Sequence, residues 1–233
     1  MGVDTQKNIA LLIFALSPEA EQRQKYIAGK KGLYELLNQH TLKLAKALDI
    51  PFFHFTEKEQ QGNNFGERYT HAIKQVFSRG YEGIITIGND TPSLGCAHLQ
   101  SAYDKLKSGN AVLGPSLDGG FYLLAIPKTM FSEDEFLSIY WNSSSVFRQM
   151  QQYLEKKKES LCLLNALGDL DSPSDIPFLL DRCINIPIGI KKILIKSRQK
   201  GEKIGNHLVS YISIHRYSRI LNRGSPFLFA LHN

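Results

Sequence analysis

The sequence predicts an α/β protein in which helices cover both faces of a mostly parallel sheet, and two observations indicate this fold class. Residues 9–16 form a continuous apolar run and residues 83–88 a β-branched run, both typical of strands that are covered on both faces. Segments with apolar residues at helical spacing alternate with these runs. Because ligands of such sheets bind outside the carboxyl ends of the strands, functional residues are expected at those ends.

The individual elements follow from the spacing of apolar residues and from the turn formers between them. Four elements are expected after the first strand: a helix over residues 32–48, a strand over 52–55, a helix over 68–79 and the strand over 83–88. Beyond them the pattern predicts a helix ending near residue 107, strands at 111–113 and 120–126, helices at 132–137 and 143–158, a strand at 161–165, and a helix with Ser172 as its cap and Pro173 in its first turn.

The composition is that of a globular protein, with 233 residues of which 42% are hydrophobic and 21% charged. The N-terminal apolar run is too short to span a bilayer, and Glu19 and Glu21 follow it where a signal peptide would need small residues, so a cytoplasmic protein is expected. Cys96, Cys162 and Cys183 are odd in number and far apart, which indicates buried thiols rather than disulfides or a zinc site.

Basic charge is concentrated at the C-terminus. Residues 182–233 hold ten Lys or Arg and one acid, a net charge of +9, which leaves −3 for residues 1–181 out of the total of +6. We therefore predict a domain over residues 1–181 and a basic, helical extension over 182–233. The extension could meet nucleic acid or an anionic membrane, but packing on the domain or on a second copy in a homo-oligomer is favoured.

Carboxylates cluster at three predicted strand ends. Asp90 follows the strand at 83–88, Asp118 lies between the paired strands, and Asp169, Asp171 and Asp175 follow the last strand. If these ends converge, two or three carboxylates would hold a divalent cation against a diphosphate. Turn chemistry is the alternative, because Asp before Gly commonly forms turns and Asp or Ser before Pro commonly opens helices.

Five sequence blocks carry a family resemblance. In chain order they are QGNNFGER (61–68), GNDTPSL (88–94), GPSLDGGFY (114–122), WNSSSV (141–146) and DLDSPSD (169–175). This series resembles a bacterial branch of the nucleotide-diphospho-sugar transferase superfamily, labelled as glycosyltransferases of unconfirmed substrate and similar to guanylyltransferases that act on phospholactate. The resemblance covers about residues 9–180 and implies a Rossmann-like GT-A fold, a three-layer α/β/α sandwich.

The resemblance also implies site residues. Asp90 and Asp118 match acidic positions expected to ligate Mg²⁺ or Mn²⁺, while Asp118 and Asp171 are the catalytic candidates. Asp118 could serve metal or acceptor, and the sequence does not separate these roles. Residues expected to bind substrate are Asn89, Thr91, Gly119, Gly120, Trp141, Arg23 and Lys25, although Trp141 could equally be a core aromatic.

One segment departs from the family. Where the family has a Gly- and Lys-rich phosphate loop, this chain reads SPEAEQRQKY over residues 17–26. Arg23 and Lys25 could hold phosphates in its place, and the basic segment GKKG at 29–32 is another candidate, although it lacks the spacing of a P-loop. The expected function is therefore a metal-dependent glycosyltransferase that uses a nucleotide sugar and a small-molecule acceptor. A nucleotidyltransferase acting on a small phosphorylated acceptor and a non-catalytic protein are the alternatives, and Glu19 or Glu21 projecting into the phosphate site would favour the latter.

Overall fold

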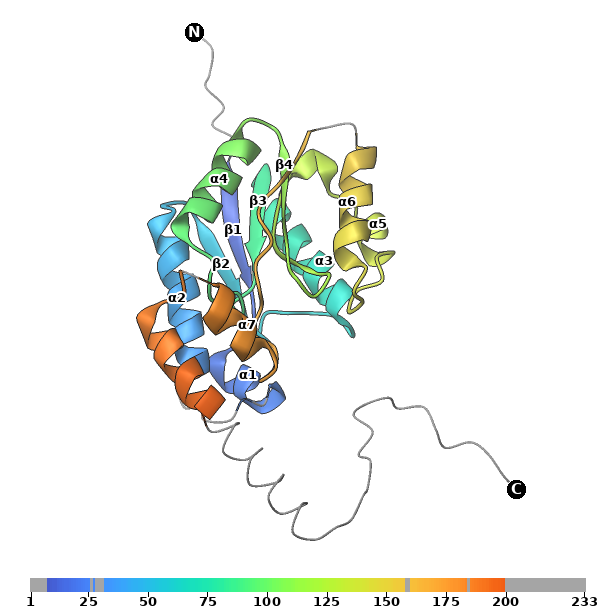
Figure 1. Cartoon of the computed structure of the whole chain (residues 1–233). Coiled ribbons are helices and arrows are strands. Elements are labelled where there is room, and N and C mark those ends of the chain that lie inside the picture. The colour runs from blue at the N-terminus through green and yellow to red at the C-terminus, as the bar shows by residue number, and fades with distance from the viewer. Residues whose placement is uncertain (1–7, 26, 28–31, 158–159, 184, 200–233) are drawn as a thin grey trace, which may run out of the picture.

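The computed structural model describes residues 8–25, 27, 32–157, 160–183 and 185–199 (Figure 1). Within them, six strands form one sheet in the order β2-β1-β3-β5-β4-β6. All neighbouring strands pair in parallel except β5, which is antiparallel to β3 and β4. The strands are β1 (Ile9–Phe14), β2 (Phe52–Phe55), β3 (Gly83–Ile87), β4 (Ala111–Pro115), β5 (Phe121–Pro127) and β6 (Leu161–Leu163).

Helices lie between and around these strands (Figure 1). They are α1 (Pro18–Gln24), α2 (Leu33–Ala47), α3 (Phe65–Ser78), α4 (Cys96–Lys107), the short η1 (Lys128–Met130), α5 (Glu133–Leu137), α6 (Val146–Lys156) and α7 (Asp175–Arg182). Residues 188–199 are also helical. The predicted α/β class is confirmed.

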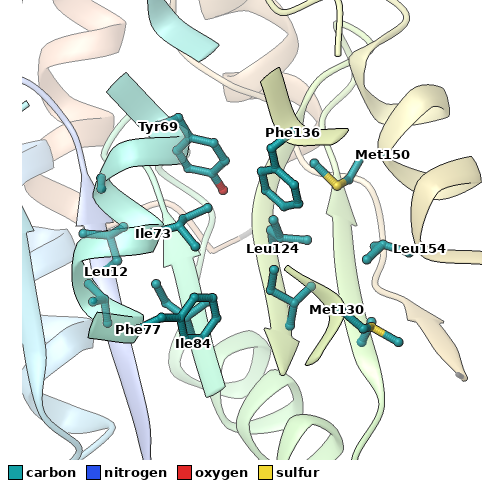
Figure 2. Packing of buried hydrophobic residues seen from close by; sticks show 14 of the residues in the cluster. Leu12, Tyr69, Ile73, Phe77, Ile84, Leu124, Met130, Phe136, Met150 and Leu154 are labelled. Atoms are coloured by element: carbon teal, nitrogen blue, oxygen red, sulfur yellow. The ribbon is translucent and has the colours of Figure 1, made fainter. Parts of the chain in front are cut away.

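Helices cover both faces of the sheet. Side chains alternate between the two faces along each strand, so neighbouring residues of one strand belong to different clusters. Leu12, buried on one face, belongs to a cluster built with α3, α5 and α6 (Figure 2). Its neighbour Leu11 belongs to the opposite cluster, built with α2 and α4. The structure therefore has three layers, α/β/α, as the family resemblance implied.

The N-terminus of α3 is fixed by reciprocal hydrogen bonds. The side chain of Asn64 accepts from the backbone N–H of Glu67 at 2.9 Å, and Oε2 of Glu67 accepts from the backbone N–H of Asn63 at 2.7 Å. These bonds satisfy backbone donors that the helix itself leaves unpaired. They begin the helix at Phe65, three residues before the predicted start.

Residues 17–26, which stand where the family has its phosphate loop, contain the helix α1. Ser17 is its N-cap and accepts from the backbone N–H of Ala20 at 3.3 Å, and Pro18 occupies the first helical position. Serine before proline and an acid is a helix-start signal that the comparison with a phosphate loop obscured. At α7 the helix was predicted to start too early. Ser174, rather than the predicted Ser172, is its N-cap, and the helix begins at Asp175.

The start of the C-terminal extension packs on the domain. Ile190 and Leu194 of the 188–199 helix are buried with Leu33 of α2 and Leu179 of α7. Residues 200–233, which make up most of the predicted basic, helical extension, lie outside the described residues. Within the described part of the chain, no helix is both long and apolar enough to cross a membrane.

The three cysteines are unpaired, as predicted, but their expected burial is wrong. Cys96 is exposed at the start of α4, and Cys162 and Cys183 are partly buried. Cys96 is exposed because it begins a helix whose apolar face is carried by residues such as Leu99 and Leu106.

Candidate functional site

A cleft of about 1000 Å³ opens at the edge of the sheet where β1 and β3 end. The turn between β4 and β5 reaches the same edge, because β5 runs back along the sheet. The segment between β6 and α7 closes another side with Asp169 and Asp171. Four of the five predicted acidic positions, Asp90, Asp118, Asp169 and Asp171, are thus brought into one cleft.

The charged lining of the cleft is predominantly acidic. Six acids line it, Glu21, Glu57, Asp90, Asp118, Asp169 and Asp171, against two bases, Lys25 and Arg68. The formal balance is −4. Glu57 accepts hydrogen bonds from the backbone N–H and the hydroxyl of Ser17, both at 2.8 Å, and so ties the segment after β2 to the start of α1.

Lys25 lies at the centre of a carboxylate cluster. Its Nζ lies 2.8 Å from Oδ1 of Asp171 and 3.3 Å from Oδ2 of Asp90. Glu21, one turn earlier in α1, lies 3.5 Å away through Oε2. Lys25, expected to bind phosphate, is therefore paired with carboxylates from three parts of the chain.

Burial and the neighbouring charges shift the pKa values of Lys25 and Glu21. Burial is the largest effect on Lys25 and disfavours its charge, but Asp90, Glu21 and Asp171 together outweigh it and raise the pKa of the ammonium. Burial also raises the pKa of Glu21, and the nearby ammonium of Lys25 opposes this. Glu21 lines the cleft whereas Glu19 is exposed, so one of the two glutamates does project into the site.

Asp169 was expected only as one of three acids in its turn, without a role of its own. Burial, followed by the charge of Asp90, raises its pKa from 3.8 to about 7. Its Oδ1 accepts a 2.5 Å hydrogen bond from the hydroxyl of Thr91, and the backbone N–H of Leu170 donates to the carbonyl of Asp90 at 2.8 Å. A carboxyl that titrates near neutrality is suited to proton transfer.

Asp118 is held in place by its own turn. Its Oδ1 accepts from the backbone N–H of Gly120 at 2.9 Å, and Gly120 lines the cleft beside it. Gly119 has φ +96°, and a Cβ there would lie 2.1 Å from the carbonyl oxygen of Ser144. Gly119 therefore allows the 143–146 segment to approach the turn, and Phe147 donates to its carbonyl at 2.9 Å.

Three other predicted binding residues differ in their placement. Asn89 lines the cleft and donates to the carbonyl of Leu16 at 3.4 Å. Thr91 is buried and is engaged by Asp169 as described above. Arg23 is exposed on α1, and its Nε donates to the carbonyl of Glu19 at 3.2 Å. Arg23 is thus bonded to its own helix.

Trp141 combines the two interpretations left open by the sequence. It lines the cleft, and it packs in an aromatic cluster with ring centroids 5.2 Å from Tyr69 and 5.5 Å from Phe65. Its Nε1 donates to the carbonyl of Phe136 at 2.8 Å. The aromatic lining was missed because its members are scattered in sequence, and only the fold brings them together.

The carboxylates suit a hard divalent cation in donor chemistry but do not form a completed site. Asp90, Asp118 and Asp169 offer only oxygen donors, which Mg²⁺ and Mn²⁺ prefer. Within the described residues, however, no group of three or more His, Cys, Asp or Glu side chains is arranged to hold a metal ion. Asp90 is also paired with Lys25. A cation bound here would need oxygens from a ligand as well.

The central segment of the chain matches a known protein family. Residues 37–143 match the family described as "Uncharacterized protein conserved in bacteria (DUF2064)". The matched segment contains Asp90, Asp118 and Trp141, whereas α1 and the segment after β6 lie outside it. No curated protein matches the chain significantly.

One of three similar solved structures supports the fold. A "putative nucleotide-diphospho-sugar transferase" from Desulfovibrio desulfuricans G20 is 23% identical over 75% of this chain and 87% of its own, with a TM-score of 0.61. A 4-diphosphocytidyl-2C-methyl-D-erythritol synthase from Anaerococcus prevotii is 11% identical over 84% and 99%, with a TM-score of 0.48. A manganese complex of Rv0371c from Mycobacterium tuberculosis is 14% identical over 75% and 99%, with a TM-score of 0.40. The first overlap supports the GT-A-like fold, whereas the other two superpose too poorly, with TM-scores below 0.5, to bear on this chain.

Proposed function

We propose that the cleft binds a nucleotide diphospho-sugar together with a divalent cation, and that the protein is a glycosyltransferase. The observation that carries the proposal is the convergence of Asp90, Asp118 and Asp169 from separate parts of the chain on one cleft. This cleft lies at the ligand-binding edge of a Rossmann-like sheet. Three-layer folds of this kind host many functions, so the proposal depends on the site rather than on the fold.

The charge of the cleft supports a role for the cation. A diphosphate would meet six acids and two bases, and Lys25 is already paired with three of the acids. Without a counter-ion the ligand would be repelled at short range. Mg²⁺ is typically held by one or two carboxylates together with phosphate oxygens, which agrees with the incomplete protein site.

The chain's own residues have distinct parts in this proposal. Asp90 and Asp118 would hold the cation, whose chemistry is to neutralise charge on the departing diphosphate. Asp118 and Asp171 remain the catalytic candidates, and Asp169 joins them as a carboxyl able to hold a proton near pH 7. Asn89 and Gly120 line the wall between them and would orient the ligand.

Isothermal titration with a panel of nucleotides and nucleotide sugars, with and without Mn²⁺, tests the proposal. We expect at least one nucleotide sugar to bind only when Mn²⁺ is present, and Asp90→Asn to weaken its binding about tenfold or more. Asp134→Asn, an exposed carboxylate on α5, is the control of matched chemistry. Failure of every panel member, or equal binding without Mn²⁺, would contradict the proposal.

Glu21 favours a second candidate, a protein that binds such a ligand without turning it over. Its buried carboxylate lines the cleft in the segment where the family has phosphate-binding amides. Product analysis separates the possibilities. A glycosyltransferase releases nucleoside diphosphate from the bound sugar, a nucleotidyltransferase releases pyrophosphate from a triphosphate, and a binding protein releases neither.

A further inference from the structure

The cleft has an aromatic wall in addition to its acidic one. Six aromatic residues line it, and one of them, Tyr122, packs against His98. The other five, contributed by β1, α3, β5 and the segment after α5, pack together as the wall: Phe14, Phe65, Tyr69, Phe121 and Trp141. Tyr69 is buried, and the other four are only partly buried. Aromatic surface left facing a cleft is unfavourable in water and favours a ligand with apolar or ring surface.

The wall is rigid before any ligand arrives. The indole of Trp141 is fixed by its hydrogen bond to Phe136, and it lies so close to α3 that a Cβ on Gly66 would be 2.2 Å from its Cδ1. Phe65 and Tyr69 stack with ring centroids 5.7 Å apart. Side chains that are already ordered cost little further entropy when they bind a ligand.

Arg68 brings a positive charge to the same part of the cleft. It lies one turn beyond Phe65 on α3, so the two side chains share a helix face, and both line the cleft. Among the described residues, no carboxylate lies within ion-pair distance of Arg68, whereas Lys25 is paired with three. A guanidinium in this state is suited to bidentate binding of a phosphate or carboxylate.

We propose that the aromatic wall and Arg68 form a second subsite, distinct from the acidic half, that binds an anion carrying an apolar or aromatic ring. The ring packs against Phe65 and Trp141, and the phosphate or carboxylate pairs with Arg68. The subsite does not require a nucleotide in the acidic half. If the glycosyltransferase proposal also holds, the ring-bearing anion is its acceptor.

Trp141 is the single tryptophan of the chain, so its fluorescence reports directly on the subsite. Three probes are titrated without metal or nucleotide: phenyl phosphate, which has ring and anion, phenol, which has the ring, and inorganic phosphate, which has the anion. We expect a saturable change in emission with phenyl phosphate, with an affinity at least tenfold higher than for either of the other two.

Variants then assign the contacts. Arg68→Gln should weaken phenyl phosphate binding about tenfold, as expected for the loss of one charge-assisted pair. Lys43→Gln, exposed on α2, removes the same charge from the surface and should leave the affinity unchanged. Phe65→Leu should weaken phenyl phosphate without changing the response to inorganic phosphate. Thermal unfolding of each variant establishes that it is folded.

Three results would overturn the proposal: equal affinity for inorganic phosphate and phenyl phosphate, equal loss in the Arg68 and Lys43 variants, or competitive displacement of phenyl phosphate by UDP with Mg²⁺. The last would mean that the wall belongs to the nucleotide. Because the titration uses no nucleotide, its result is independent of whether a nucleotide sugar binds.

Discussion

Replacing Asp169 by Asn should stabilise the protein, and increasingly so as the pH rises. The folded structure raises the pKa of this carboxyl from 3.8 to about 7. A raised carboxyl pKa means that the fold favours the protonated form. Its contribution to stability is therefore fully present below about pH 3.8 and is lost as the pH rises to about 7. At 1.36 kcal/mol per pH unit, the loss amounts to about 4 kcal/mol at most.

An amide stays neutral throughout this range and so avoids the loss. We expect roughly half of the maximum, about 2 kcal/mol at pH 8, because an amide oxygen accepts the Thr91 hydrogen bond more weakly than a carboxylate does. The assay is urea unfolding of both proteins at pH 4, 6 and 8 in the presence of EDTA. A stability difference independent of pH, or an Asn variant less stable than wild type at pH 8, would refute the reasoning. Asp134→Asn, exposed on α5, should show no such growth with pH.

Three further substitutions test individual contacts. Gly119→Ala should lower the free energy of thermal unfolding by about 3 kcal/mol, since it combines positive φ with a clash at Ser144. Gly80→Ala, at φ +92° with nothing within 4 Å, is the control and should cost about 1 kcal/mol. Equal costs would show that the clash contributes nothing. Lys25→Met should cost about 2 kcal/mol at pH 7, less than for a fully buried pair because Asp171 is half exposed. Because the pKa of Lys25 is raised, its contribution should be fully present at pH 7 and persist to pH 10, and unfolding free energies measured between these values check the sign. Tyr69→Phe should lower the free energy of urea unfolding by about 1 kcal/mol, since it removes a 2.5 Å hydrogen bond to the hydroxyl of Thr86. The hydroxyl of Thr86 keeps its hydrogen bond to the carbonyl of Leu124. An unchanged unfolding free energy would show that the bond to Tyr69 is energetically neutral.

The sheet and its ligand-binding edge could be predicted because they depend on local patterns. The apolar run ending at Phe14 and the β-branched run ending at Ile87 specify buried strands wherever they occur in the chain. Asp90 and Asp118 could be expected at the same edge because each lies three residues beyond the end of a strand, β3 for Asp90 and β4 for Asp118. The order of strands, with β5 reversed between β3 and β4, gave no comparable local signal.

The chemistry of the cleft depended on tertiary contacts that have no signature in sequence. Nothing near Lys25 indicates that its partners lie at Asp90 and Asp171. Nothing in the 169–175 turn distinguishes the partly buried Asp169 from the exposed Asp171. Arg68 stood within a recognised block, but only the structure shows that it lines the cleft with the aromatic wall and that no carboxylate of the described residues pairs with it. Such properties arise from the environment rather than from the residue itself.

The ion pairs of Lys25 with Asp90 and Asp171 also act as a reversible crosslink between distant parts of the chain. It joins α1 to the end of β3, 65 positions away, and to the segment before α7, a task that secreted proteins often give to disulfides. An ionic link differs in that salt, acid or a competing cation opens it reversibly. A metal-bound ligand that claims Asp90 would remove the contact with the end of β3 and leave the ammonium paired with Asp171 and Glu21. Occupancy of the cleft would thus weaken one of the contacts that hold the end of α1.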